Sequence, residues 1–155
     1  MLRVNILLIS TVFIFTGCGD STSVHNQGKD CVSCHSSFDS GVTIFNSLNA
    51  SDRNATDTAN GYKVRLVLDD GNTISYVKGR GDGNLYWKGD EGTINDFTVE
   101  ILDENGKIVN KSRENSHNVG RLRCNSCHTQ DGLNNAPGRV VSYDYNQLLS
   151  NIIAK

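Results

Sequence analysis

The chain has 155 residues, of which 37% are hydrophobic and 21% charged, which is enough for one compact domain but too little for a large multidomain enzyme. Its 15 basic and 17 acidic side chains give a formal net charge of −2, so the sequence offers no basic surface for nucleic acid. Aromatic residues make up only 7% and polar turn-forming residues are frequent, which favours a small β-rich extracytoplasmic protein.

Residues 1–17 have the pattern of an export signal. Arg3 precedes an apolar run over residues 6–15, which is too short to span a bilayer. The Phe-Thr-Gly-Cys sequence that ends at Cys18 resembles a bacterial lipobox, so cleavage would leave Cys18 to carry a lipid; an ordinary secretory signal with an incidental cysteine is the alternative. Because Gly19 follows the cysteine, we expect an outer-membrane lipoprotein on the periplasmic or cell-surface face.

The other four cysteines form two copies of the Cys-x-x-Cys-His motif that attaches c-type haem. The copies are Cys31, Cys34 and His35, and Cys124, Cys127 and His128. Two thiols at this spacing can add to the two vinyl groups on one porphyrin edge, and the following histidine is then the proximal ligand of the iron. The sequence therefore predicts two c-type haems, with His35 and His128 as proximal ligands.

Two other uses of these cysteines are possible. The two Cys-x-x-Cys pairs could join in one Cys₄ zinc site, which would account for the sulfurs but not for the paired histidines. Each pair could instead close a disulfide, although bridges between cysteines so close in sequence are strained and more typical of redox motifs than of structural staples.

The two remaining histidines stand in a second repeated pattern. His25 and His117 each begin a His-Asn-x-Gly-basic sequence, six residues before Cys31 and seven before Cys124. The only methionine is Met1, which leaves with the signal, so bis-histidine ligation is predicted, together with reduction potentials below those of Met/His cytochromes. The sequence leaves open whether each histidine serves its nearest haem, the other haem or a neighbouring subunit; an exposed loop histidine is the alternative.

Residues 41–110 have the pattern of an antiparallel β-sandwich. Apolar and polar residues alternate in short segments separated by turn sequences. The predicted strands are residues 42–45, 62–68, 73–77, 85–87, 96–102 and 108–109. We expect Trp87 and Phe97 to be core residues. Lys29 and Arg121, beside the two haem motifs, could pair with haem propionates, although a solvated surface role is equally consistent with their positions.

The end of the chain predicts a short helix over residues 143–154, in which Tyr145 and Leu148 share an apolar face. The predicted organisation follows from these segments. It comprises a signal peptide at 1–17, an anchor, tether and first haem segment at 18–40, the sandwich at 41–110, and a second haem segment with the helix at 111–155.

The sequence resembles a family of bacterial two-haem c-type cytochrome lipoproteins, in which a carboxypeptidase-regulatory-like, immunoglobulin-like β-sandwich lies between the haem motifs. The resemblance covers nearly the whole mature chain. It rests on residues 25–35, on the Gly-Asn-Leu-Tyr turn at 83–86, on 125–129 and on 136–140. It implies extracytoplasmic electron transfer with other cytochromes or redox proteins as donor and acceptor.

We therefore expect an electron carrier rather than an enzyme. A di-haem peroxidase-like enzyme is one alternative, and it would need an iron with an open or displaceable coordination position. A structural subunit of a haem-containing surface assembly is another, and it would make the protein a homo-oligomer.

Overall fold

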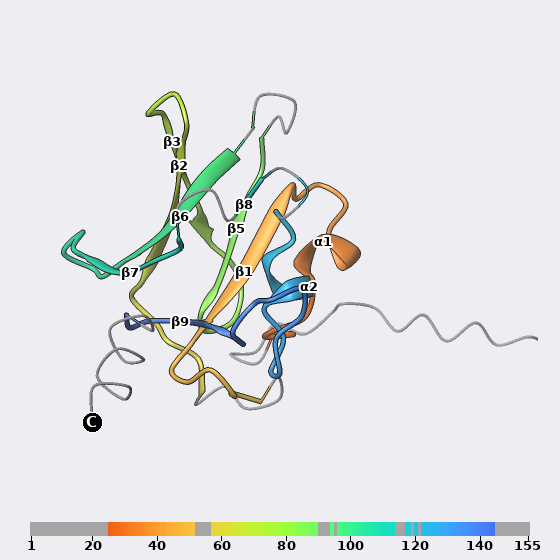
Figure 1. The fold of residues 1–155 in the computed structure, drawn as a ribbon. Coiled ribbons are helices and arrows are strands. Elements are labelled where there is room, and N and C mark those ends of the chain that lie inside the picture. Colours follow the sequence, from red (N-terminus) through yellow and green to blue (C-terminus); the bar gives the residue numbers. More distant parts are fainter. Residues whose placement is uncertain are drawn as a thin grey trace, which may run out of the picture.

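The computed structural model describes residues 25–51, 57–89, 94, 96–113, 117–118, 120 and 122–144. These residues form two mainly antiparallel sheets and two very short helices, which confirms the predicted mainly β, sandwich-like fold (Figure 1). The predicted signal peptide, the lipid-bearing Cys18, Arg121 and nearly all of the predicted C-terminal helix lie outside the described residues.

The first sheet is built around β1 (Ser40–Phe45), whose six residues are all buried. An antiparallel partner, β5 (Asn84–Trp87), lies on one side of β1 and carries β4 (Val77–Lys78) at its outer edge. On the other side, β9 (Val140–Val141) pairs parallel to β1. The strand order is therefore β4-β5-β1-β9, and β1 is the central strand.

The second sheet pairs β2 (Lys63–Leu68) with β6 (Asp96–Leu102) along the full length of β2. Outside this pair lie β3 (Thr73–Ser75) next to β2, and β7 (Ile108–Lys111) and β8 (His117–Asn118) next to β6. Alternate side chains of β2 and β6 point toward the first sheet, because successive residues of a strand face opposite sides. The shared core consists mainly of aliphatic side chains, and it includes Val64, Leu66, Phe97 and Ile101.

The predicted strand over residues 73–77 divides at Tyr76, and its two parts belong to different sheets. The Tyr76 N–H donates to the Val64 carbonyl at 2.9 Å, whereas its buried hydroxyl bonds Ser40 on β1. The backbone therefore passes from the second sheet to the first at Tyr76. The prediction of one continuous strand was wrong because alternation in sequence does not show which sheet each residue joins.

The core predictions for the two large aromatic residues have different outcomes. Phe97 is buried, with 2% of its surface exposed, while Trp87 is half-buried and packs against the edge of the core.

Among the described residues, no helix is both long enough and apolar enough to cross a membrane.

The two helices are the Cys-x-x-Cys turns themselves. They are α1 (Cys31–Cys34) and α2 (Cys124–Cys127), and both pack against β1 (Figure 1). Segments separated by about ninety positions in sequence therefore lie on the same central strand. Strand β1 thus serves as the common support of both Cys-x-x-Cys-His motifs.

We predict that Gly41→Ala moves α1 away from β1. A Cβ atom at this position would lie 2.4 Å from Cys31 Cβ and 2.7 Å from Cys31 Sγ, so a side chain has no room there. Such overpacking typically lowers the free energy of unfolding by about 1 to 3 kcal/mol. Urea denaturation would measure the loss, with Ser36→Ala in the exposed turn after the motif as a control that should change stability by less than about 0.5 kcal/mol.

Candidate cofactor-attachment sites

Both Cys-x-x-Cys-His motifs have the same local structure. In each, the cysteines bound one helical turn, and the histidine N–H closes that turn on the carbonyl of the first cysteine: His35 on Cys31 at 3.0 Å and His128 on Cys124 at 2.8 Å. Side chains three apart share one face of a helical turn. Each turn therefore presents two sulfurs and an imidazole from one short segment.

At the first site, His25 lies across from His35. Their ring centres are 6.0 Å apart and the ring planes are tilted by 41°. The His25 carbonyl accepts a hydrogen bond from Asn84 Nδ2 at 2.7 Å, which attaches this part of the chain to β5. The two imidazoles border an open cavity of about 340 Å³ that also reaches Cys31 and Cys34.

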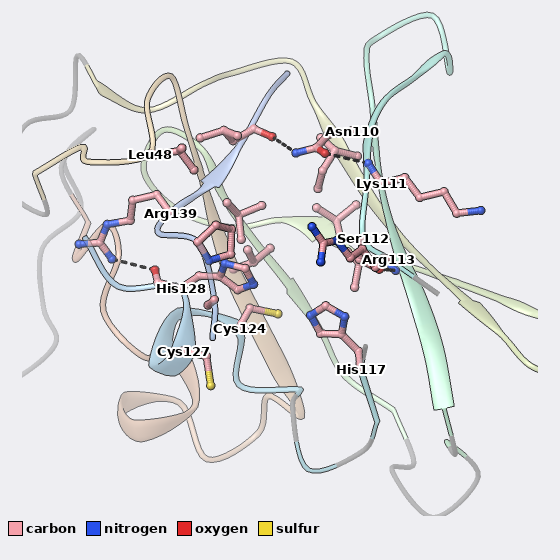
Figure 2. Close-up of a pocket in the computed structure, with 18 of the residues that line it drawn as sticks. Leu48, Asn110, Lys111, Ser112, Arg113, His117, Cys124, Cys127, His128 and Arg139 are labelled. Atoms are coloured by element: carbon pink, nitrogen blue, oxygen red, sulfur yellow. Dashed lines mark hydrogen bonds between the residues drawn. The ribbon is translucent and has the colours of Figure 1, made fainter. Parts of the chain in front are cut away.

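At the second site, His117 lies across from His128, with ring centres 6.3 Å apart and planes inclined by 13°. Figure 2 shows these rings on facing walls of the cavity, with Cys124 and Cys127 beside them. Strand β8 holds His117 against β6, where its ring stacks on Phe97 at 5.7 Å. The cavity has a volume of about 280 Å³ and lies between the sheets.

The apolar wall of this second cavity comes from both sheets and from the loops beside β1 and β9. It consists of Val42, Leu48, Val64, Val99, Ile101, Ala136, Pro137, Val140 and Val141. A flat apolar group could therefore be enclosed between the two sheets, with polar contacts at its rim.

The orientation of His128 is fixed by a carbonyl. Its Nδ1 lies 2.8 Å from the Gly138 carbonyl oxygen, and because a carbonyl only accepts hydrogen bonds, Nδ1 carries the hydrogen. This tautomer leaves Nε2 with the lone pair that a metal requires. Burial also lowers the pKa of His128 below its usual value, which keeps the ring neutral.

The histidine separations match ligation of one metal from both sides. A first-row metal bonds imidazole nitrogen at about 2.0 Å, so two imidazoles on opposite sides of one ion have ring centres roughly 6 Å apart. The observed values are 6.0 and 6.3 Å. The structure places His25 beside His35 and His117 beside His128, so the two histidines of each pair come from the same segment.

The described cysteines do not form the disulfides considered above. Cys31, Cys124 and Cys127 are free thiols, so neither motif closes a bridge on itself. Cys34 is disulfide-bonded and is not one of these free thiols. Over the described ranges, no three His, Cys, Asp or Glu side chains gather in a group that could hold a metal ion by themselves, so the geometry gives no support to a Cys₄ zinc site.

Burial keeps two of these thiols protonated. Desolvation, assisted by the neighbouring Cys124, raises the pKa of Cys31 to about 11, and burial also raises the pKa of Cys124. Because the thiolate is the reactive form, a raised pKa lowers the reactive fraction of both sulfurs at neutral pH.

Asn125, inside the second motif, joins the two sites. It is 3% exposed, and its Nδ2 donates to the Lys29 carbonyl at 2.8 Å and to Thr43 Oγ1 at 3.1 Å, while its Oδ1 accepts from the Thr43 N–H at 3.0 Å. It therefore links α2, the segment before α1, and β1. The sequence included Asn125 only among the residues of the resemblance, without a structural role, because a position between two motif cysteines carries no signal for such a contact.

Arg139 also joins the two segments. Its guanidinium donates to the carbonyls of Ala50, Gly28 and His128 at 3.2, 3.3 and 3.1 Å, and it lies 4.9 Å from the Phe45 ring centre. Burial lowers the pKa of Arg139 below its usual value. The sequence suggested Arg139 only through the resemblance, without a structural role.

Both cavities have cationic side chains at their rims. Lys29, which the sequence analysis considered as a propionate partner, lines the first cavity together with Lys78, Arg80 and Lys88. Lys111, Arg113 and Arg139 line the second cavity. A ligand that carries carboxylates would find cations at either site.

No family model, curated protein or solved structure matches this chain. The family resemblance therefore stays a prediction from the motifs, and the function has to be argued from the sites themselves.

We predict that Asn125→Ala lowers the free energy of unfolding by about 2 to 4 kcal/mol, because it leaves the Lys29 carbonyl and the Thr43 N–H without this partner in a buried environment. Guanidinium denaturation measures the loss. Ser126→Ala is the matched control, since Ser126 is exposed in the same turn, and it should cost less than about 1 kcal/mol. Equal losses in the two variants would contradict the bridging role of Asn125.

Proposed function

We propose that this chain is an exported, lipid-anchored di-haem c-type cytochrome that passes single electrons between other redox proteins. The observation that carries the proposal is the duplicate geometry: each Cys-x-x-Cys-His turn faces a second imidazole, at 6.0 Å in one site and 6.3 Å in the other. Two independent segments of the chain reach the same arrangement. Bis-histidine haem accounts for the thiols, the imidazoles and their separation together.

The cysteines would hold each porphyrin by addition of their thiols to its vinyl groups. Each sulfur would then hold the porphyrin through a carbon–sulfur bond. Cys31, Cys124 and Cys127 are thiols as this requires, whereas the disulfide at Cys34 would first be reduced by a dithiol, which becomes a disulfide in exchange.

The histidines would hold the iron from both faces. A bound haem supplies reversible one-electron chemistry between ferric and ferrous iron, and neutral imidazoles suit a six-coordinate centre that changes little between the two states. The hydrogen bond from His128 Nδ1 to Gly138 keeps one of these ligands in the required tautomer. If two histidines bind each iron, neither iron would keep the open position that the peroxidase-like alternative needs.

The cations at the rims would pair with the haem propionates. Lys29 lies at the first cavity, which Phe38, Leu85 and Tyr86 also line, and Arg113 lies at the second, beside its apolar wall. If Cys18 carries the lipid, seven residues of tether reach at most roughly 24 Å to His25, so the first haem would lie close to the membrane surface.

The test is to produce the protein in a host that matures c-type cytochromes and to count its haem. We expect pyridine haemochrome and intact mass to give two haems per chain and visible spectra to be low-spin in both redox states. A variant with Cys31→Ala and Cys34→Ala should hold one haem, and a variant that lacks all four motif cysteines should hold none. A colourless wild-type product would end the proposal, and a high-spin fraction that binds carbon monoxide or peroxide would favour the peroxidase alternative.

A further inference from the structure

Exposed positive charge is concentrated at the first site. Four exposed cationic residues line its cavity, and we refer to them as the cationic rim: Lys29, Lys78, Arg80 and Lys88. Of the described residues that line this cavity, only Asp30 is acidic, and it forms an ion pair with Arg123. This concentration contrasts with the chain as a whole, whose formal charge is −2.

The second cavity has fewer exposed cations, Lys111 and Arg113, against four at the first. Lys111 lies 3.7 Å from the Glu100 carboxylate, and Arg139 is buried with its guanidinium bonded to backbone carbonyls. Lys111 and Arg139 are thus paired within the protein, so the second cavity carries less exposed positive charge than the first. A negatively charged protein approaching from solution would be drawn to the first site rather than to the second.

An aromatic stack connects the cationic rim to the proposed iron ligand. The Phe38 ring stacks on His35 at 4.6 Å and on Tyr86 at 4.2 Å. The Lys88 amine lies over the same stack, 5.2 Å from the centre of Phe38 and 5.8 Å from that of Tyr86. The rim is therefore held directly beside the side chain that would carry the first haem iron.

We propose that the cationic rim is the docking surface for an acidic redox protein that exchanges electrons with the first haem. This inference rests on the proposed function. The two propionates of one haem would balance two of the four cations, so about two positive charges remain to attract a partner. In each encounter one electron passes between the partner's redox centre and the first haem iron, so one is oxidised as the other is reduced.

An anionic membrane could in principle be attracted to the same charges. A protein partner is favoured because the rim surrounds the redox site and the aromatic stack leads to it, so a membrane seated there would cover the point of electron exchange. Charge complementarity of this kind mainly raises the association rate, which makes kinetics the appropriate measurement.

The test uses the full-length, haem-loaded protein and an oxidised acidic blue-copper protein as the electron acceptor in stopped-flow experiments. The wild-type rate constant should fall about tenfold or more as ionic strength rises, and Lys78→Glu with Lys88→Glu should lower it by about tenfold at low salt. The matched control is Lys63→Glu with Lys107→Glu, exposed lysines on β2 and in the turn between β6 and β7, which should change the rate constant by less than about twofold. Oxidation by hexaammineruthenium(III), a cation, should not slow in the rim variant.

Haem counting on the same samples separates the two proposals. A protein without haem would overturn the proposed function, whereas a two-haem, low-spin protein whose rates ignore salt and rim charge would overturn only the docking surface. Loss of the charge effect when Cys31 and Cys34 are alanine, and its retention when Cys124 and Cys127 are, would support exchange through the first haem. If the rim substitutions abolish binding to anionic phospholipid vesicles but leave transfer to the blue-copper protein unchanged, the rim serves a membrane and the docking proposal is wrong.

Discussion

Replacing His117 with alanine is expected to turn one of the two haems high-spin and to leave the other low-spin. The His117 ring lies 6.3 Å from that of His128, at the separation of two ligands on one iron. Alanine would leave the sixth position of that iron open to water or an added ligand, so about half of the haem should bind carbon monoxide. His25→Ala should have the same effect on the other haem.

The ligand pairing can be tested in a protein that holds a single haem. With Cys124→Ala and Cys127→Ala only the first haem remains, and its spectrum should change with His25→Ala but not with His117→Ala. Crossed ligation would give the reverse result. A ligand donated by a neighbouring subunit would make the low-spin fraction depend on protein concentration, whereas pairing within a segment makes it independent of concentration.

A second substitution controls for structural damage at His117. Because its ring also stacks on Phe97, alanine removes packing as well as a ligand. His117→Met restores a side chain that can bind iron, so we expect a low-spin spectrum together with a raised reduction potential. If neither substitution changes the spectrum, His117 is not a ligand.

The local patterns in the sequence predicted much of the fold because strand alternation and haem attachment both depend on near neighbours in sequence. The pattern around β2 and β6 correctly gave two buried faces, and the Cys-x-x-Cys-His spacing marked both turns. Division of the strand at Tyr76 was not predictable in the same way, since it depends on a hydrogen bond to Ser40, a residue far away in sequence.

The arrangement of the histidines could not be predicted from the sequence, because it depends on the tertiary fold. His25 precedes His35 by ten positions, a span that an extended chain makes roughly 34 Å long, yet the ring centres lie 6.0 Å apart because Asn84 on β5 holds the His25 carbonyl. The buried hydrogen bonds of Asn125 and Arg139 could likewise not be predicted from the sequence. Their partners are backbone groups brought together by β1, and no side-chain pattern in the sequence marks a backbone partner.

Arg139→Met is expected to destabilise the protein by about 3 to 5 kcal/mol, because three buried carbonyls lose a charged donor at once. Those carbonyls belong to Ala50, Gly28 and His128, so the change loosens the segment before α1 and the loop after α2 together. Guanidinium denaturation followed by circular dichroism measures the loss. Arg80→Met, at an exposed arginine, should change stability by less than about 0.5 kcal/mol.

Arg139→Lys separates the shape of this side chain from its charge. Lysine keeps the positive charge but lacks the planar fork that reaches several carbonyls, so part of the stability should still be lost.

A buried cation beside His128 disfavours the additional positive charge of ferric iron, so Arg139→Met should lower the reduction potential of the second haem while Arg139→Lys leaves it nearly unchanged. Redox titration of the single-haem protein with Cys31→Ala and Cys34→Ala measures this haem alone. Equal potentials in all three proteins would limit Arg139 to a structural role, and a lowered potential in the methionine variant only would show that the same buried cation holds the two segments together and tunes the second haem.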